Sequence, residues 1–155
     1  MIVAVVGSSS CTPAEKDAAE AIGRLLAEAG ATLVCGGRGG VMAAACRGAK
    51  SAGGLTVGIL PGVDRSEANP WVDVPIVTGL GEARNALVVR SAEVVIAVGG
   101  GYGTLSEIGF ALKWGKRVVG LGTWDLVRDG QPDRSIVRAA SPEEAVSKAL
   151  GSERD

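Results

Sequence analysis

The residues best equipped for chemistry form one continuous run, Gly99-Gly100-Gly101-Tyr102-Gly103-Thr104-Leu105-Ser106-Glu107. The run follows the apolar segment 94–98, which is typical of a buried strand, and it leads into a stretch that favours a helix. Glycines let backbone amides approach an anion closely, and the first turn of a helix adds unpaired amides and about half a positive charge. The run therefore predicts a cradle for a phosphate group, to which the Thr104 hydroxyl can also donate.

The spacing of this run narrows the class of ligand. No Gly-Lys-Ser/Thr follows the glycines, so the run is not a Walker A loop. It is also not a clean GxGxxG with an acidic residue at the end of the next strand, which favours a mononucleotide or another phosphate monoester over a dinucleotide. A purely structural alternative stays open, in which the glycines serve only a tight turn and close helix packing.

Two charged residues near this run could take part in a reaction. Thr104 and Glu107 fit a capping box, so Glu107 could simply cap its own helix. If a phosphate binds instead, Glu107 must point away from it, toward the ribose of a nucleotide, where it could bind sugar hydroxyls or activate water. Arg84 lies near the start of an expected helix over 81–91, where a cation opposes the helix dipole at a cost of about 0.3–1 kcal/mol. It is either functional or an exposed side chain balanced by Glu82.

Two other loops are candidates for the same site. The glycine-rich loop 36–40, which includes Arg38, is either a second anion contact or a simple strand-to-helix turn. The serines at 8–10 could donate hydroxyl groups to a base or a sugar. Met42 is expected to serve helix packing.

The elements that must position these residues alternate along the chain. Apolar strands are expected at 2–6, 31–35, 56–60, 94–98 and 118–121, with short strands at 75–77 and 136–137. Helices are expected at 13–29, 41–52, 81–91 and 104–114, and a last one opens at Pro142. This order predicts a Rossmann-like α/β fold, a doubly wound, mainly parallel sheet with helices on both faces. Residues 1–150 are expected to form one nucleotide-binding domain and 151–155 a frayed tail.

Ligands of such folds bind beyond the carboxyl ends of the strands. The loops after Val6, Cys35, Leu60 and Val98 are therefore the informative ones. Residues 62–74, which are rich in Pro, Asn, Asp and Gly, are expected to form an irregular surface loop.

Composition argues against several classes of function. Sixteen Lys and Arg against seventeen Asp and Glu leave a net charge of −1, without the basic excess that binds nucleic acid or an anionic membrane. The sequence has no histidine, which excludes histidine bases, Ser-His-Asp triads and histidine metal sites. The three cysteines, at 11, 35 and 46, fit no metal or disulfide pattern. Only five aromatic residues argue against an aromatic-lined pocket or a stacking platform. No signal peptide or apolar run of about 18 residues is present, so a soluble cytoplasmic protein is expected.

Five segments stand in a recognisable order: Val5-Val6-Gly7-Ser8-Ser9, the run from Gly36 to Met42, Gly58-Ile59-Leu60-Pro61, Arg84, and the run from Gly100 to Glu107. In this order they resemble the LOG family, whose well-studied members are cytokinin riboside 5′-monophosphate phosphoribohydrolases. In that family the residues that match Arg84 and Glu107 are catalytic, and the loop that matches 100–104 holds the 5′-phosphate. The resemblance implies hydrolysis of the N-glycosidic bond of a nucleoside 5′-monophosphate to free base and ribose 5-phosphate, with no metal or redox cofactor. The phosphate- and nucleotide-binding residues that it implies are Gly100, Gly101, Tyr102, Gly103, Thr104, Asn85, Gly7, Ser8, Ser9, Gly37, Arg38 and Met42.

The sequence also departs from the LOG pattern. Gly99 replaces a proline, Asn85 replaces a lysine, the first glycine loop is one residue shorter, and the region after Trp124 is short. These departures resemble a sister branch close to the molybdenum-cofactor carrier proteins and other relatives of DNA-processing protein A. Molybdopterin also ends in a phosphate monoester, so a non-catalytic carrier of the molybdenum cofactor is the alternative to a hydrolase of AMP-like nucleotides. The resemblance further implies a homodimer or higher homo-oligomer.

Overall fold

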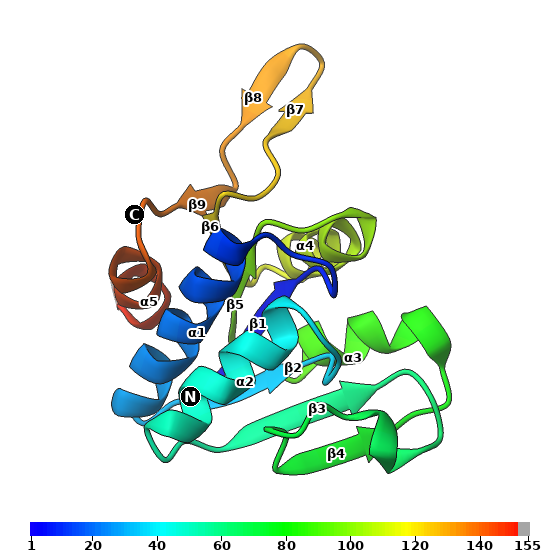
Figure 1. Cartoon of the computed structure of the whole chain (residues 1–155). Coiled ribbons are helices and arrows are strands. Elements are labelled where there is room, and N and C mark those ends of the chain that lie inside the picture. Colours follow the sequence, from blue (N-terminus) through cyan, green and yellow to red (C-terminus); the bar gives the residue numbers. More distant parts are fainter. Residues whose placement is uncertain (152–155) are drawn as a thin grey trace.

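The computed structural model describes residues 1–151, which form a parallel sheet between two layers of helices (Figure 1). Seven strands pair in the order β4-β3-β2-β1-β5-β6-β9, and every pair is parallel. The strands are β1 (Ile2–Gly7), β2 (Thr32–Cys35), β3 (Thr56–Leu60), β4 (Val74–Val77), β5 (Val94–Val98), β6 (Arg117–Leu121) and β9 (Ile136–Arg138). The predicted doubly wound, Rossmann-like fold is confirmed.

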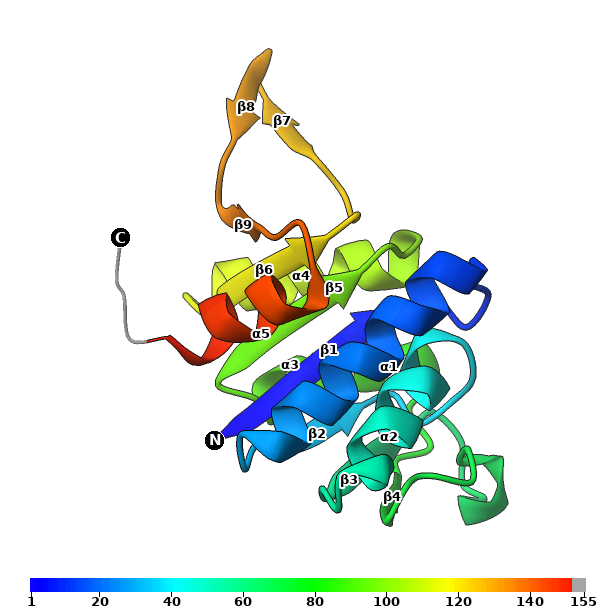
Figure 2. The same ribbon diagram turned by 60° about the vertical axis from the view of Figure 1, so that its left-hand side comes forward.

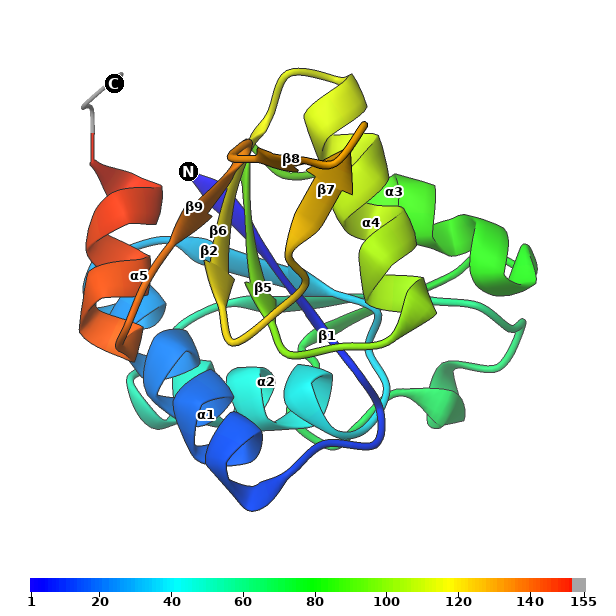
Figure 3. The same cartoon turned by 90° about the horizontal axis from the view of Figure 1, so that it is seen from above.

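The helices divide between the two faces of the sheet. Helices α1 (Pro13–Glu28), α2 (Val41–Ser51) and α5 (Pro142–Leu150) cover one face, and α3 (Arg84–Arg90) and α4 (Tyr102–Lys113) cover the other (Figures 2 and 3). The central strand β5 is buried along its whole length, because helices lie on both of its sides. This explains its unbroken apolar sequence, which is typical of parallel sheets.

Local signals set the limits of α1 and α5 as the sequence predicts. The Thr12 side chain accepts a hydrogen bond from the Glu15 amide at 3.1 Å, and the Ser141 side chain does the same for Glu144 at 3.1 Å. A proline follows each cap at the first helical position. Gly30 takes a φ of +78° just after α1, which is the left-handed conformation that ends many helices.

Two predicted helix starts are wrong. Helix α4 begins at Tyr102 rather than Thr104, with Gly101 as its first flanking residue, so Thr104 lies inside the first turn and caps nothing. The capping-box interpretation of Thr104 and Glu107 therefore fails. The expected helix 81–91 begins with a 3₁₀ turn, η2 (Gly81–Ala83), and becomes α-helical only at Arg84.

A hairpin between β6 and β9 is the main element that the sequence analysis missed. Strands β7 (Leu126–Arg128) and β8 (Gln131–Asp133) pair antiparallel and extend away from the body of the protein (Figure 1). Asp129 and Gly130 form its tip with φ of 52° and 74°. Asp-Gly is a strong two-residue hairpin signal, so the turn was readable from the sequence. The predicted irregular loop 62–74 also contains a short 3₁₀ turn, η1 (Arg65–Glu67).

Helices α1 and α2 approach each other through two glycines. A Cβ on Gly23 would overlap the carbonyl of Ala45, and a Cβ on Gly48 would overlap the carbonyl of Glu20. The Gly23→Ala variant is therefore expected to lose about 1–3 kcal/mol of unfolding free energy through overpacking. Urea denaturation measures this loss. The control is Gly109→Ala on α4, where a Cβ meets nothing within 4 Å. Equal stability of the two variants would contradict the close helix contact.

Among residues 1–151, no helix is long and apolar enough to cross a membrane.

Candidate functional site

The candidate residues gather at the carboxyl ends of the central strands. Strand β1 lies between β2 and β5, so the chain winds to one side of β1 and then returns to the other. In such a sheet the loops that follow the two central strands separate and leave a crevice for a ligand. Here these loops are 8–12 after β1 and 99–101 after β5.

In the loop after β5 and the start of α4, five consecutive backbone amides have no hydrogen-bond acceptor among the described residues. Within residues 1–151, no acceptor takes a hydrogen bond from the amides of residues 100–104, which we call the amide cradle. The first intrahelical bond of α4 comes only from Leu105 to the Gly101 carbonyl, at 3.0 Å. A row of free amides at a helix start is an anion-binding arrangement, because the helix dipole adds to the donors.

Glycine is required in the cradle for two different reasons. Gly100 has a φ of 104°, and a Cβ there would overlap the Thr104 side chain. Gly101 has no other atom within 4 Å of a Cβ position, and at Gly103 the nearest such atom is Asn85 Nδ2 at 3.8 Å. Space around these two residues lets a ligand approach the backbone.

Thr104 supplies a hydroxyl at the floor of the cradle. The residue is only 4% exposed, yet the described part of the chain offers its hydroxyl no hydrogen-bond partner. Its side chain lies against Gly100. No side-chain polar atom that is itself buried lacks a partner among the described residues, so this hydroxyl is open to the cradle side and can donate to a ligand there.

Arg84 is held by backbone carbonyls. Its Nε donates to the Ile59 carbonyl at 2.9 Å, and its Nη2 donates to the Gly36 carbonyl at 3.4 Å. Burial lowers the pKa of Arg84, while the Glu107 charge opposes this shift. The side chain is half-buried, so the alternative of an exposed arginine balanced by Glu82 is wrong.

A chain of polar contacts joins Arg84 to the amide cradle. Its Nη1 donates to the side-chain oxygen of Asn85, whose Nδ2 lies 3.5 Å from Ser106 Oγ. Ser106 Oγ donates in turn to the Gly103 carbonyl at 2.6 Å. The arginine therefore has a defined position relative to the first turn of α4. Ser106 was not among the predicted site residues.

Glu107 is a half-buried carboxyl group near Arg84. Burial raises the pKa of Glu107 to about 8, and the nearby Arg84 charge only partly offsets the effect. Among the described residues, none lies within 4 Å to form an ion pair with it. At neutral pH this carboxyl group is mostly protonated and can donate a hydrogen bond or a proton.

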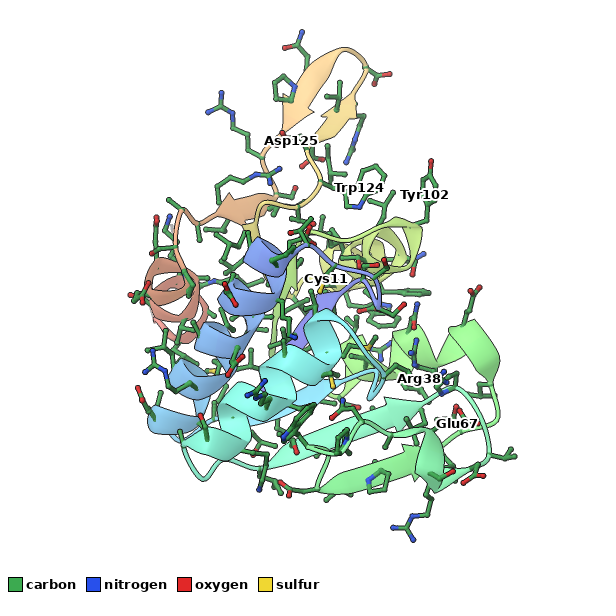
Figure 4. All side chains as sticks on the ribbon, in the orientation of Figure 1. Cys11, Arg38, Glu67, Tyr102, Trp124 and Asp125 are labelled. Carbon is green, nitrogen blue, oxygen red and sulfur yellow. The ribbon has the colours of Figure 1, made fainter. Side chains whose placement is uncertain are left out.

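The second glycine loop, which follows β2, lies beside the loop after β1, and several of its groups have protein partners. The Gly37 amide donates to Cys35 Sγ at 3.3 Å, so it is not free for an anion. Arg38 Nη1 forms an ion pair with Glu67 Oε2 at 3.1 Å, and both side chains point to the same side of the molecule (Figure 4). The Val41 amide donates to the Ser8 carbonyl at 3.1 Å, which joins this loop to the one after β1.

The remaining predicted residues shape these loops. Gly7 leaves room for Val41, and Met42 is buried against Gly36, beside the Arg84 guanidinium. Ser9 is exposed at the loop after β1. Their contact with a ligand stays a prediction.

Two further clusters escaped the sequence analysis. Tyr102 and Trp124 lie together at the start of α4 (Figure 4), with ring centroids 5.6 Å apart, although aromatic residues are scarce. Cys35 and Cys46 are buried with their sulfur atoms 3.5 Å apart, and all three cysteines are free thiols. The contact with Cys46, together with burial, raises the pKa of Cys35, which disfavours the reactive thiolate form of this residue. Within the described residues, no group of three or more potential ligands could hold a metal ion.

Known proteins share this architecture over almost the whole chain. The molybdenum cofactor binding protein of the phototrophic bacterium Rippkaea orientalis is 42% identical with a TM-score of 0.86, covering 95% of this chain and 93% of that one. The molybdenum cofactor carrier protein MCP of Chlamydomonas reinhardtii is 36% identical with a TM-score of 0.81, covering 95% and 94%.

Two more distant relatives match as well. The cytokinin riboside 5′-monophosphate phosphoribohydrolase LOG of Oryza sativa subsp. japonica is 35% identical over 115 residues, which are 68% of this chain and 47% of the rice protein. The chain thus spans about half the length of that relative. DNA processing protein A of Helicobacter pylori, 22% identical with a TM-score of 0.71, shares the fold.

These matches confirm the predicted resemblance to the LOG family and to its sister branches. A family model described as the SLOG cluster4 family matches residues 1–146. The chain belongs to the SLOG cluster4 family.

Proposed function

We propose that this protein binds a phosphate monoester in the amide cradle and carries the molybdenum cofactor as its cargo. The five free amides of residues 100–104 are the observation that carries this proposal. A phosphate group accepts several hydrogen bonds at once, so it satisfies these donors and the Thr104 hydroxyl together. The phosphate of molybdopterin meets this requirement.

Two observations favour the cofactor over a nucleotide as cargo. The molybdenum cofactor binding and carrier proteins match over 95% of this chain, whereas the rice LOG match covers 68% of it. Asn85, which replaces the lysine of the LOG pattern, points its side-chain oxygen at Arg84 and so restrains that arginine.

Loading with cofactor tests the proposal. The purified protein is incubated without oxygen with molybdenum cofactor released from a molybdoenzyme, separated by gel filtration, and oxidised to convert bound cofactor into fluorescent pterin. Pterin is expected to elute with the wild-type protein and not with a Gly100→Ala variant. Equal pterin in the two protein fractions would contradict binding at the cradle.

The pair Arg84 and Glu107 supports a second candidate function, hydrolysis of a nucleoside 5′-monophosphate. Glu107 is mostly protonated at neutral pH, so it suits a general acid that protonates a departing base. Arg84 would hold the nucleotide beside it. Incubation with AMP tests this activity through the release of adenine and ribose 5-phosphate. Release that exceeds background, and that Glu107→Gln abolishes, would establish the hydrolase; no release would exclude AMP as a substrate.

We also propose that the protein self-associates and binds no nucleic acid. Strand β4 closes one edge of the sheet, and Val74, Ile76 and Val77 leave part of its apolar surface exposed. A second copy could cover this surface. Sedimentation velocity measures the oligomeric state of the protein. The expected cytoplasmic location remains a prediction.

A further inference from the structure

An aromatic pair is attached to the amide cradle. Trp124 Nε1 donates to the Gly101 carbonyl at 3.1 Å, so the indole is fixed to the cradle backbone. The Tyr102 ring lies against it, tilted by 36°, and Tyr102 is 82% exposed (Figure 4). Exposure of an apolar ring face to water is unfavourable, and a planar ligand that stacks on the ring would cover this face.

A cavity of about 300 Å³ opens beside this pair. It lies between the start of α1 and the loops after β5 and β6. Gly100 belongs both to the cavity and to the cradle, so the two sites are contiguous. The lining residues are Glu15, Gly99, Gly100, Gly122, Thr123 and Trp124.

The Glu15 carboxylate is a hydrogen-bond acceptor in this cavity and favours neutral N–H donors over anions. One carboxylate oxygen receives a hydrogen bond from Thr12 Oγ1 at 3.1 Å, and the other lies over Gly99, where a Cβ would overlap it. A phosphate in the cavity would be repelled by this carboxylate. A neutral ring that offers N–H donors would be attracted instead, because a carboxylate accepts two parallel hydrogen bonds.

We propose that this cavity binds the heterocycle of the phosphate ester, with Glu15 accepting from a 2-amino-4-oxopyrimidine edge and Tyr102 and Trp124 providing the apolar wall. Pterins and guanine present this edge of adjacent N–H and NH₂ donors, and adenine does not. The inference rests on the proposed function, since the phosphate in the cradle positions the ring.

The position of this subsite also separates it from the hydrolase candidate. Tyr102 and Glu107 are five residues apart on α4, so their side chains leave the helix about 140° apart. A ligand ring that stacks beside Tyr102 lies away from Glu107. The ester bond of the ligand, and the glycosidic bond of a nucleotide, are then out of reach of the Glu107 carboxyl group. Binding at this subsite therefore favours a carrier.

Calorimetric titration with matched ligands tests the subsite. Ribose 5-phosphate tests binding to the cradle alone. AMP adds a heterocycle that lacks the 2-amino-4-oxopyrimidine edge, whereas GMP and neopterin phosphate carry a heterocycle with that edge. GMP and neopterin phosphate are expected to bind about 10- to 100-fold more tightly than ribose 5-phosphate, and GMP more tightly than AMP. The ratio between GMP and neopterin phosphate distinguishes a guanine from a pterin ligand.

Two variants isolate the contributions. Tyr102→Ala is expected to reduce the advantage of the ring-bearing ligands about tenfold and to leave ribose 5-phosphate unchanged. Glu15→Gln keeps the Thr12 contact and is expected to erase the preference for GMP over AMP. Glu20→Gln, on the same helix, removes an equal charge outside the cavity and should change nothing.

The outcomes separate this inference from the proposed function. If ribose 5-phosphate binds but the ring adds no affinity, or if both variants keep the wild-type ratios, the subsite is wrong and the cradle stands. If ribose 5-phosphate does not bind, the cradle is wrong. The subsite then stands only if unphosphorylated neopterin binds and Glu15→Gln abolishes that binding; otherwise it is wrong as well.

Discussion

The Gly100→Ala variant is expected to bind ribose 5-phosphate at least about a hundredfold more weakly than the wild-type protein. Gly100 has a φ of 104°, and a Cβ there would overlap the Thr104 side chain, so the loop must move. Each hydrogen bond to a charged group contributes about 1.5–3 kcal/mol, and loss of two of them already exceeds a hundredfold. Isothermal titration calorimetry measures the two affinities.

Two matched variants show whether such a loss comes from the cradle. Gly109→Ala lies on the same helix, meets nothing within 4 Å, and should bind as the wild type does with equal or higher stability. Thr104→Val removes only the hydroxyl, which has no protein partner among residues 1–151, so it should weaken binding about tenfold with little change in stability. Undiminished binding by folded Gly100→Ala protein would remove the basis of the proposed function.

Glu107 is expected to make the stability of the protein fall as the pH rises from about 4.5 to above 8. Burial raises the pKa of its carboxyl group from 4.5 to about 8, so the folded state holds a proton that the unfolded state has released. The stabilisation is complete below the unfolded pKa and is lost as the pH rises through the folded pKa. The shift corresponds to a change of up to about 5 kcal/mol in unfolding free energy.

Urea denaturation at a series of pH values measures this dependence. Glu107→Gln cannot ionise and keeps the shape of the carboxyl group, so its stability curve should be flatter between pH 5 and 9. At pH 9 the variant should be more stable than the wild-type protein. Parallel curves for the two proteins would show that another group dominates the titration.

The candidate site was predictable where it depends on local sequence. The five amides of the cradle follow from consecutive glycines between an apolar strand and a helix, and the structure leaves them without protein partners. The start of α4 was misplaced because Thr104 and Glu107 have the spacing of a capping box, although the helix begins two residues earlier, at Tyr102. A capping box is compatible with many sequences, and only backbone geometry decides whether it forms.

The parts that depend on tertiary contacts were not predictable. Tyr102 and Trp124 are 22 residues apart, and they meet only because β6 pairs with β5 and returns the chain to the start of α4. The carbonyls that hold Arg84 come from Ile59 and Gly36, on two other loops. The raised pKa of Glu107 arises from burial by several elements together, which no sequence window contains.

The amide cradle contains no lysine or arginine, since residues 100–104 are three glycines, one tyrosine and one threonine. Attraction there comes from the backbone amides and the helix dipole, without a cationic side chain. The charge of the bound ester then sets its residence time. The dianion of a phosphate monoester takes up one proton near pH 6, so mild acidification halves its negative charge and weakens its binding to the amides. For the proposed carrier, acidification would thus weaken the phosphate contact without any movement of the protein's side chains.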